Sequence, residues 1–258
     1  MLKRAVIFGL GVAVSGCVPD EPAKGKGGPV AAPAPAPPPP PPVLQAPLPQ
    51  PAPPAEPPDP PLTGSFTDDF ERPALGPDWR ATSGVWKIDG GKLCGRSARN
   101  HGVWLKRRLP VNARIEFDAT SASPEGDLKL EVWGDGRSHA TGVSYTNATS
   151  YVVIFGGWKN QFHVLARIDE HARDRKEVRL DPAGADLRTR RVEAGRQYRF
   201  KIERSDGKTV RWWVDNVEIH SYADPAPLSG EGHEHMGFND WEVPVCFDNL
   251  KVEPLTGN

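Results

Sequence analysis

The stretch YRFKIERSDGKTVRWWVDNVEIHSY (residues 198–222) has the pattern of three short β-strands joined by two tight turns. Apolar and polar residues alternate along it, which is the period of a strand with one face in a core and the other toward water. SDG (205–207) and DN (215–216) separate the strands, and residues of these types tolerate the positive φ of hairpin turns. The stretch therefore predicts an antiparallel sheet.

The same alternation recurs along the chain after residue 64, and no segment has the period of a helix. Further strands are predicted within 85–96, 113–121, 127–133, 150–158, 161–169, 235–241 and 245–253. Segment 150–158 is apolar on both faces, which indicates a central strand. The polar segment 171–195 is expected to be a surface loop with one short strand, 176–181. About twelve short strands at regular spacing predict an all-β, two-sheet sandwich.

The N-terminus has the features of an export signal. A basic pair at 3–4 precedes an apolar run, 5–14, which is too short to span a bilayer. The run ends in VSGC (14–17), which resembles the lipobox of bacterial lipoproteins. That resemblance implies a signal peptide over residues 1–16 and a lipid on Cys17, with an ordinary signal peptide as the alternative. It also implies a place in the bacterial cell envelope, in the outer membrane on its periplasmic side or at the cell surface.

The next segment has a composition that favours disorder. Of the 29 prolines, 20 lie between Pro19 and Pro61, with few aromatic or β-branched residues among them. Such a segment cannot bury enough apolar surface to offset the entropy of ordering. We therefore predict a proline-rich tether over 17–63 and one folded domain over 64–258. The net charge of −1, with 32 basic and 33 acidic residues, argues against nucleic acid as a partner.

Several motifs together carry a family resemblance. DDF (68–70), the hairpin WKIDGGKL (86–93), MGF (236–238) and FDNLKV (247–252), with the stretch quoted first, occur in this order. In this arrangement they resemble the concanavalin A-like lectin/glucanase jelly roll, and in detail its bacterial LamG-like and 3-keto-disaccharide-hydrolase-like members. The resemblance implies a jelly-roll sandwich and contact with carbohydrate.

In that family the central strands adjoin in a concave sheet, and this implies one patch on its outward face. The patch would contain Glu131, Trp133, His163, Arg167, Arg211 and Trp213. Indole rings stack on the C–H faces of sugars, and charged groups form hydrogen bonds with hydroxyls. Alternatively, the tryptophans cap the core, and Glu131 and Arg167 neutralise each other.

Three functions are compatible with these residues. The first is a lipid-anchored module that binds a glycan without cutting it. The second is a glycosidase or keto-sugar hydrolase with Glu131 and His163 as its acid/base pair. RIEFDATS (114–121) offers Glu116 and Asp118 as well, but no third carboxyl follows to donate a proton, and a solvent-facing strand also explains the pair. The third is a structural envelope protein without a ligand.

Two further features concern stability. Cys94 and Cys246 are expected either to form a disulfide, as an exported domain permits, or to be two buried thiols. Related jelly rolls hold a structural Ca²⁺ near the last strand, and by that resemblance Asp69 and Asp248 would supply oxygen ligands. Hydrogen bonding of Asp248 to nearby backbone amides is the alternative. No other cofactor is predicted.

Overall fold

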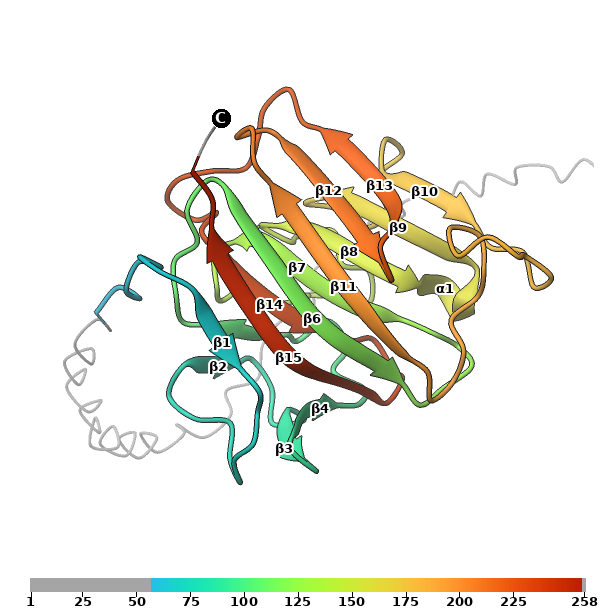
Figure 1. Cartoon of the computed structure of the whole chain (residues 1–258), viewed down its shortest axis with the longest axis horizontal. Coiled ribbons are helices and arrows are strands. Elements are labelled where there is room, and N and C mark those ends of the chain that lie inside the picture. The colour runs from blue at the N-terminus through green and yellow to red at the C-terminus, as the bar shows by residue number, and fades with distance from the viewer. Residues whose placement is uncertain (1–56, 257–258) are drawn as a thin grey trace, which may run out of the picture. The chain divides into compact units, whose positions relative to one another are not determined.

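The structure is a computed structural model, and it describes residues 57–256. Two antiparallel sheets pack face to face, as Figure 1 shows, and residues Ala55–Asn258 form one compact unit. This confirms the predicted two-sheet, antiparallel jelly-roll sandwich. The signal peptide, Cys17 and most of the tether lie outside the described residues. Within those residues, none of the helical segments has the length and apolarity needed to cross a membrane.

The first sheet contains eight strands. Along the sheet their order is β13 (Val217–Ala223), β12 (Thr209–Val214), β11 (Gln197–Arg204), β6 (Ala113–Ser121), β15 (Val245–Pro254), β4 (Lys92–Gly95) and β3 (Lys87–Asp89), and β1 (Phe66–Asp68) also pairs with β15. The predicted three-stranded stretch forms β11, β12 and β13, in which Trp212 is buried and Arg211 is exposed as expected.

The second sheet contains seven strands. Their order is β10 (Lys176–Arg179), β9 (Phe162–Arg167), β8 (Tyr151–Gly156), β7 (Leu128–Gly134), β14 (His235–Asn239), β5 (Val103–Leu105) and β2 (Trp79–Ala81). The main core lies between the two sheets and is rich in aromatic rings. Phe117 of β6 stacks on Phe200 of β11 at 4.9 Å between ring centroids and meets Phe238 of β14 edge-on at 5.0 Å.

The chain that enters the domain is packed against it before residue 64, where we predicted the tether to end. The carboxylate of Asp59 is 8% exposed and accepts two hydrogen bonds from Arg80, at 2.9 and 3.1 Å. The amide of Leu62 donates to the carbonyl of Arg108 at 2.8 Å. Residues 59–62 therefore belong structurally to the sandwich.

A disulfide joins the strands that carry the two cysteines. Cys94 of β4 and Cys246 of β15 are register partners in the eight-stranded sheet, and their sulfur atoms are 2.09 Å apart. The alternative of two separate buried thiols does not describe this structure. The bond spans 152 residues of sequence and ties an early hairpin to the last strand.

Candidate functional site

The outer face of the seven-stranded sheet, turned away from the other sheet, is covered by other parts of the chain. Its apolar side chains form a second core with the covering loop, which we define as residues 135–149. Val152, Ile154, Val164 and Ala166 of the sheet pack there with Ala140, Tyr145 and Ala148 of the loop. The covering loop therefore shields part of the outer face of the seven-stranded sheet from solvent.

Glu131 lies under the covering loop and holds it in place. Its carboxylate accepts hydrogen bonds from Tyr145 Oη at 2.9 Å, Ser150 Oγ at 2.6 Å and Asn239 Nδ2 at 2.7 Å. The residue is 1% exposed, and this burial raises the pKa of Glu131 to about 7 although the three donors oppose the change. Glu131 is thus a buried anchor rather than a surface group.

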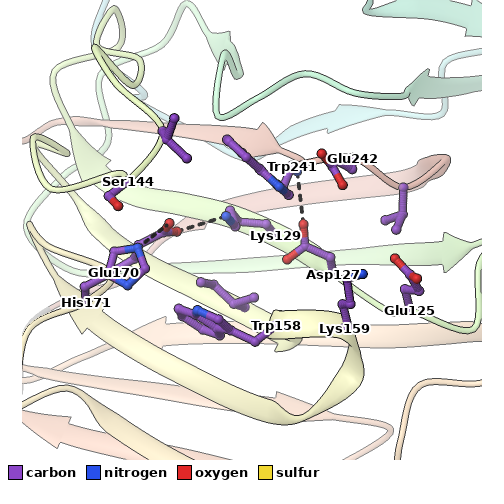
Figure 2. Close-up of a pocket in the computed structure, with 13 residues that line it drawn as sticks. Glu125, Asp127, Lys129, Ser144, Trp158, Lys159, Glu170, His171, Trp241 and Glu242 are labelled. Carbon is purple, nitrogen blue, oxygen red and sulfur yellow. Dashed lines mark hydrogen bonds and ion pairs between the residues drawn. The ribbon is translucent and has the colours of Figure 1, made fainter.

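Beyond the covering loop, the same face opens into a cavity of about 300 Å³. We call this cavity the aromatic pocket. It is lined by Glu125, Asp127, Lys129, Val143, Ser144, Ile154, Trp158, Lys159, Glu170, His171, Trp241, Glu242 and Val243. Figure 2 shows two indole rings and a row of charged groups around this space. Aromatic walls with a few polar groups are typical of ligand sites.

Each of the two tryptophans is stacked against an arginine. The guanidinium of Arg175 lies 4.4 Å from the ring centroid of Trp158, and that of Arg99 lies 4.7 Å from Trp241. Both rings are only half-buried. A guanidinium on a ring contributes roughly 0.5–1 kcal/mol at exposed sites and limits the orientations that the ring can take. Both indoles are therefore held in place at the pocket before any ligand arrives.

Trp158 is presented by a turn with an unusual backbone. The single turn α1 (Gly157–Asn160) contains Trp158 and Lys159 with φ values of 52° and 58°, and Asn160 follows at 61°. Left-handed conformation in residues other than glycine costs of order 1 kcal/mol each or more, so the surrounding structure must stabilise this turn.

The buried side chain of Asn160 supplies that stabilisation. Its amide donates to the carbonyl oxygens of Pro124 and Val192, at 2.9 and 2.8 Å, and its carbonyl oxygen accepts from the amide of Val192 at 2.9 Å. These three bonds tie α1 to two other loops. The turn places the half-exposed Trp158 ring between the second core and the aromatic pocket.

The floor of the aromatic pocket carries a buried ionic network. The ammonium of Lys129 donates to Asn100 Oδ1 at 2.7 Å and to Glu170 Oε2 at 3.0 Å, while Glu170 Oε1 lies 3.3 Å from His171 Nε2. Figure 2 shows Lys129 between Glu170 and Asp127. Burial lowers the pKa of Lys129, but its acidic neighbours outweigh that effect and leave the pKa above its usual value.

Asp127 is the second buried carboxyl of the pocket. It is 8% exposed, has a φ of 65°, and accepts a hydrogen bond from the backbone amide of Trp241 at 3.0 Å. Burial raises the pKa of Asp127 above its usual value, against the opposing charge of Lys129. Burial and the nearby Asp127 charge also raise the pKa of Asp240, to about 7.

The structure contradicts the predicted outward position of Trp133. It is fully buried in the core between the sheets, where its Nε1 donates to the carbonyl of Pro110 at 3.2 Å and the Arg204 guanidinium lies 3.9 Å from its ring. The cause is a bulge where β14 pairs with β7, at which Trp133 has a φ of 53°. A bulge adds one residue to a strand, so the alternation of faces shifts beyond it.

His163 was also predicted on the wrong face. It is fully buried on the core side of β9, stacked on Phe155 at 3.9 Å, and accepts the amide of Gly156 at 3.0 Å. Its Nε2 donates to the carbonyl of Arg190 at 3.1 Å. Burial lowers the pKa of His163 to about 3. The apolar face of β9, with Val164 and Ala166, packs under the covering loop, so the opposite face with His163 is turned to the main core. Glu131 and His163 cannot form an acid/base pair from opposite faces.

The remaining patch residues lie elsewhere. Arg167 is on the core side of β9 and its Nε donates to Asp224 at 2.9 Å, so it does not neutralise Glu131. Arg211 and Trp213 project from the outer face of the other sheet, where Lys201 lies 4.0 Å from the Trp213 ring. The six predicted residues therefore do not form one surface.

Glu116 and Asp118 lie on the outer face of β6, half-exposed. Asp118 accepts hydrogen bonds from Arg199 at 3.3 Å and Asn249 at 2.9 Å, which fits a structural role. Of the two residues predicted to bind calcium, Asp69 is exposed and accepts the amide of Glu71 at 3.2 Å. Asp248 accepts the amide of the next residue at 2.7 Å and lies 3.7 Å from Lys92.

Among residues 57–256, no group of three or more His, Cys, Asp or Glu side chains is arranged to hold a metal ion. The calcium ion therefore remains a prediction from resemblance.

The pocket tryptophans were not among the predicted site residues. Trp158 follows the apolar segment of β8 directly after two glycines, and Trp241 follows β14 by two residues. A large aromatic residue just beyond a strand end, in a loop, is the one signal in the sequence that points to them, because binding residues concentrate in loops on a rigid scaffold.

Comparison with solved structures identifies the fold. The chain resembles the carbohydrate-binding module CBM66 from Bacillus subtilis at 15% identity and a TM-score of 0.50, over 68% of this chain and 95% of that one. It resembles a sialidase at 13% identity and a TM-score of 0.52, over 74% of this chain but only 18% of the sialidase. A Bacillus licheniformis β-glucanase has 12% identity and a TM-score of 0.49, over 75% and 98% of the two chains.

No family model and no curated protein sequence matches the chain. At these identities the carbohydrate-binding module and the sialidase show a shared jelly-roll fold and leave the activity open.

Proposed function

We propose that the described domain binds carbohydrate and that the aromatic pocket holds the sugar. The observation that carries this proposal is the strained turn that holds Trp158, half-exposed, at the pocket wall. Strained backbone persists only where the surrounding structure enforces it, and it concentrates at functional sites. Part of this ring packs against the second core, and its exposed part gives a ligand at the pocket a stacking surface.

The chemistry of the pocket suits a sugar ring. The indoles of Trp158 and Trp241 offer flat apolar faces to C–H groups, and the carboxyls of Asp127 and Glu170 accept hydrogen bonds from hydroxyls. The cavity of about 300 Å³ is at the lower end of the range for ligand sites. A short segment of a glycan is therefore a better match than a large cofactor. The shared fold with a solved carbohydrate-binding module adds support.

The proposal includes attachment to the cell envelope. A lipid on Cys17 and a proline-rich tether would hold the domain at an outer membrane and leave the pocket free to meet glycans on the periplasmic side or at the surface. Metabolic labelling with a fatty acid, lost in Cys17→Ser, tests this part by itself.

A glycan array with the purified chain tests carbohydrate binding. We expect Trp158→Ala and Trp241→Ala each to weaken binding at least about fivefold, because stacking on an aromatic ring contributes roughly 1 kcal/mol or more. Trp213→Ala is the matched control, since it removes a half-exposed indole from the other sheet. The proposal fails if no glycan is retained, or if the control weakens binding as much as the pocket variants do.

A glycoside hydrolase is the second candidate, and one observation favours it. Asp127 is a buried carboxyl with a raised pKa, as a general acid requires, and Glu170 lines the same pocket. Both oxygens of Glu170 already have partners, so a free second carboxylate is lacking. Release of reducing ends from a glycan that binds, lost in Asp127→Asn, would favour this candidate over simple binding.

A further inference from the structure

We infer that the aromatic pocket discriminates by charge. It binds glycans without acidic groups, which donate a hydrogen bond to Asp127, and it rejects glycans that carry uronate or sulfate. The inference rests on the proposed function, and it names the class of ligand and the residue that selects it.

The wall of the pocket carries more carboxyl groups than ammonium groups. Four carboxyl side chains line it, Glu125, Asp127, Glu170 and Glu242, against the ammonium groups of Lys129 and Lys159. The side chain of Lys129 is 3% exposed, and two of its three N–H donors are bonded to Asn100 and Glu170, so most of its charge is already paired within the protein. Lys159 is exposed, at the rim.

The two arginines beside the pocket tryptophans are already paired with carboxylates. Arg99 and Arg175 stack on Trp241 and Trp158, and each is paired with a carboxylate, Arg99 with Glu242 at 2.7 Å and Arg175 with Glu177 at 2.7 Å. A pocket built to bind an anionic sugar would present a guanidinium to it. Here both guanidinium groups are already paired with carboxylates, and neither Arg99 nor Arg175 lines the cavity.

One oxygen of the Asp127 carboxyl can still accept a hydrogen bond from a ligand. Its Oδ2 accepts the amide of Trp241, while Oδ1 has no hydrogen-bond partner among the residues that the structure describes. Figure 2 shows this carboxyl turned into the cavity next to Lys129. A carboxyl that is more than nine-tenths buried gains from a hydrogen-bond donor. A sugar hydroxyl or an ammonium group supplies one.

A ligand carboxylate or sulfate would do the opposite. It places an acceptor against an acceptor and brings a negative charge into a pocket lined by four carboxyls and only two ammonium groups. Like charges brought together in this way cost enough to change affinity by tenfold or more. Rejection of acidic sugars therefore follows from the same group that holds the neutral ones.

The test uses matched pairs of oligosaccharides with the purified chain. The probes are hexamers of β-1,4-glucose, β-1,3-glucose and β-1,4-N-acetylglucosamine, together with C6-oxidised forms of the two glucans. In the oxidised forms a carboxylate replaces each CH₂OH group, so that every glucose becomes a uronate. We expect at least one neutral hexamer to bind, and, for a glucan that binds, the oxidised form to bind at least about tenfold more weakly. If the N-acetylglucosamine hexamer alone binds, both oxidised glucans should show no binding.

Asp127→Asn identifies the residue responsible. The asparagine can still accept the Trp241 amide but turns its NH₂ group into the pocket, so we expect weaker binding of neutral hexamers and a smaller penalty for oxidised ones. Glu116→Gln, a half-exposed carboxyl on the other sheet and outside the pocket lining, is the control and should change neither. Should Asp127→Asn fail to fold, the comparison of neutral and oxidised hexamers on the wild-type chain still tests the selectivity by itself.

The outcomes separate this inference from the proposed function. Equal or tighter binding of an oxidised form overturns the inference and leaves carbohydrate binding intact. Binding of none of the five probes contradicts both. An unchanged ratio of neutral to oxidised affinity in Asp127→Asn would remove Asp127 as the selecting residue and so overturn the inference as stated.

Discussion

The outer face of β6 meets solvent, whereas the outer face of β7 lies beneath other parts of the chain. Along β6 every second residue is half-exposed, but all seven residues of β7 are buried. The covering loop, the second core and the ionic network under the aromatic pocket account for the difference. A sheet face that is covered can bury carboxyls and shape a pocket, and a face that meets solvent cannot. The candidate site therefore lies on the covered face, beside the covering loop and between Trp158 and Trp241.

The largest expected effect compares two tryptophans that were both predicted to face outward. Trp133→Ala should lower the free energy of unfolding by roughly 3–5 kcal/mol, because it empties a large space in the main core. Trp213→Ala should lower it by less than about 1 kcal/mol, since it removes a half-exposed ring and its contact with Lys201. Urea unfolding followed by circular dichroism measures both. Similar losses in the two variants would mean that the two faces do not differ as described.

The next effect compares two glutamates, the covered Glu131 and the half-exposed Glu116. The pKa of Glu131 is about 7 when folded, against an ordinary value of 4.5. Between pH 4.5 and 7 the folded state keeps a proton that the unfolded chain releases, so stability falls as pH rises through this range. The fall from this group alone is on the order of 3 kcal/mol.

Glu131→Gln should therefore flatten the dependence of stability on pH between 4.5 and 7, measured by urea unfolding at several pH values. A slope of the same sign should survive in the variant, because the pKa of Asp240 is also raised to about 7. Glu116→Gln serves as the matched control on the solvent-facing side of β6. A Glu131→Gln profile that overlays the wild-type profile would contradict the buried carboxyl described here.

The smallest expected effect concerns the left-handed turn α1. Lys159→Gly should raise the free energy of unfolding by about 1 kcal/mol, because glycine adopts a φ of 58° without a steric penalty. Lys159→Ala is the control, since alanine keeps the penalty and should give no gain. Thermal unfolding compares the two variants. A larger gain from alanine than from glycine would show that the lysine side chain, and not the backbone, sets the cost.

The sequence predicted the fold well because the solvent-exposed face keeps its alternation. Val210, Trp212 and Val214 were assigned to the core from period alone, and all are buried there. The disulfide was one of two open alternatives. The site was predicted poorly for three physical reasons: the bulge at Trp133 shifts the alternation of β7, the apolar face of β9 packs under the covering loop instead of in the main core, and the loops that carry Trp158 and Trp241 converge only in the fold.

The bond between Cys94 and Cys246 has a consequence for the integrity of the site. Every residue that lines the aromatic pocket falls between these two positions in the sequence, so the pocket is built entirely within one covalent ring. A protease that nicks an exposed loop inside the ring, such as 181–188, would leave both fragments attached to each other. A single cleavage in an exposed loop around the pocket would therefore leave the two fragments covalently joined.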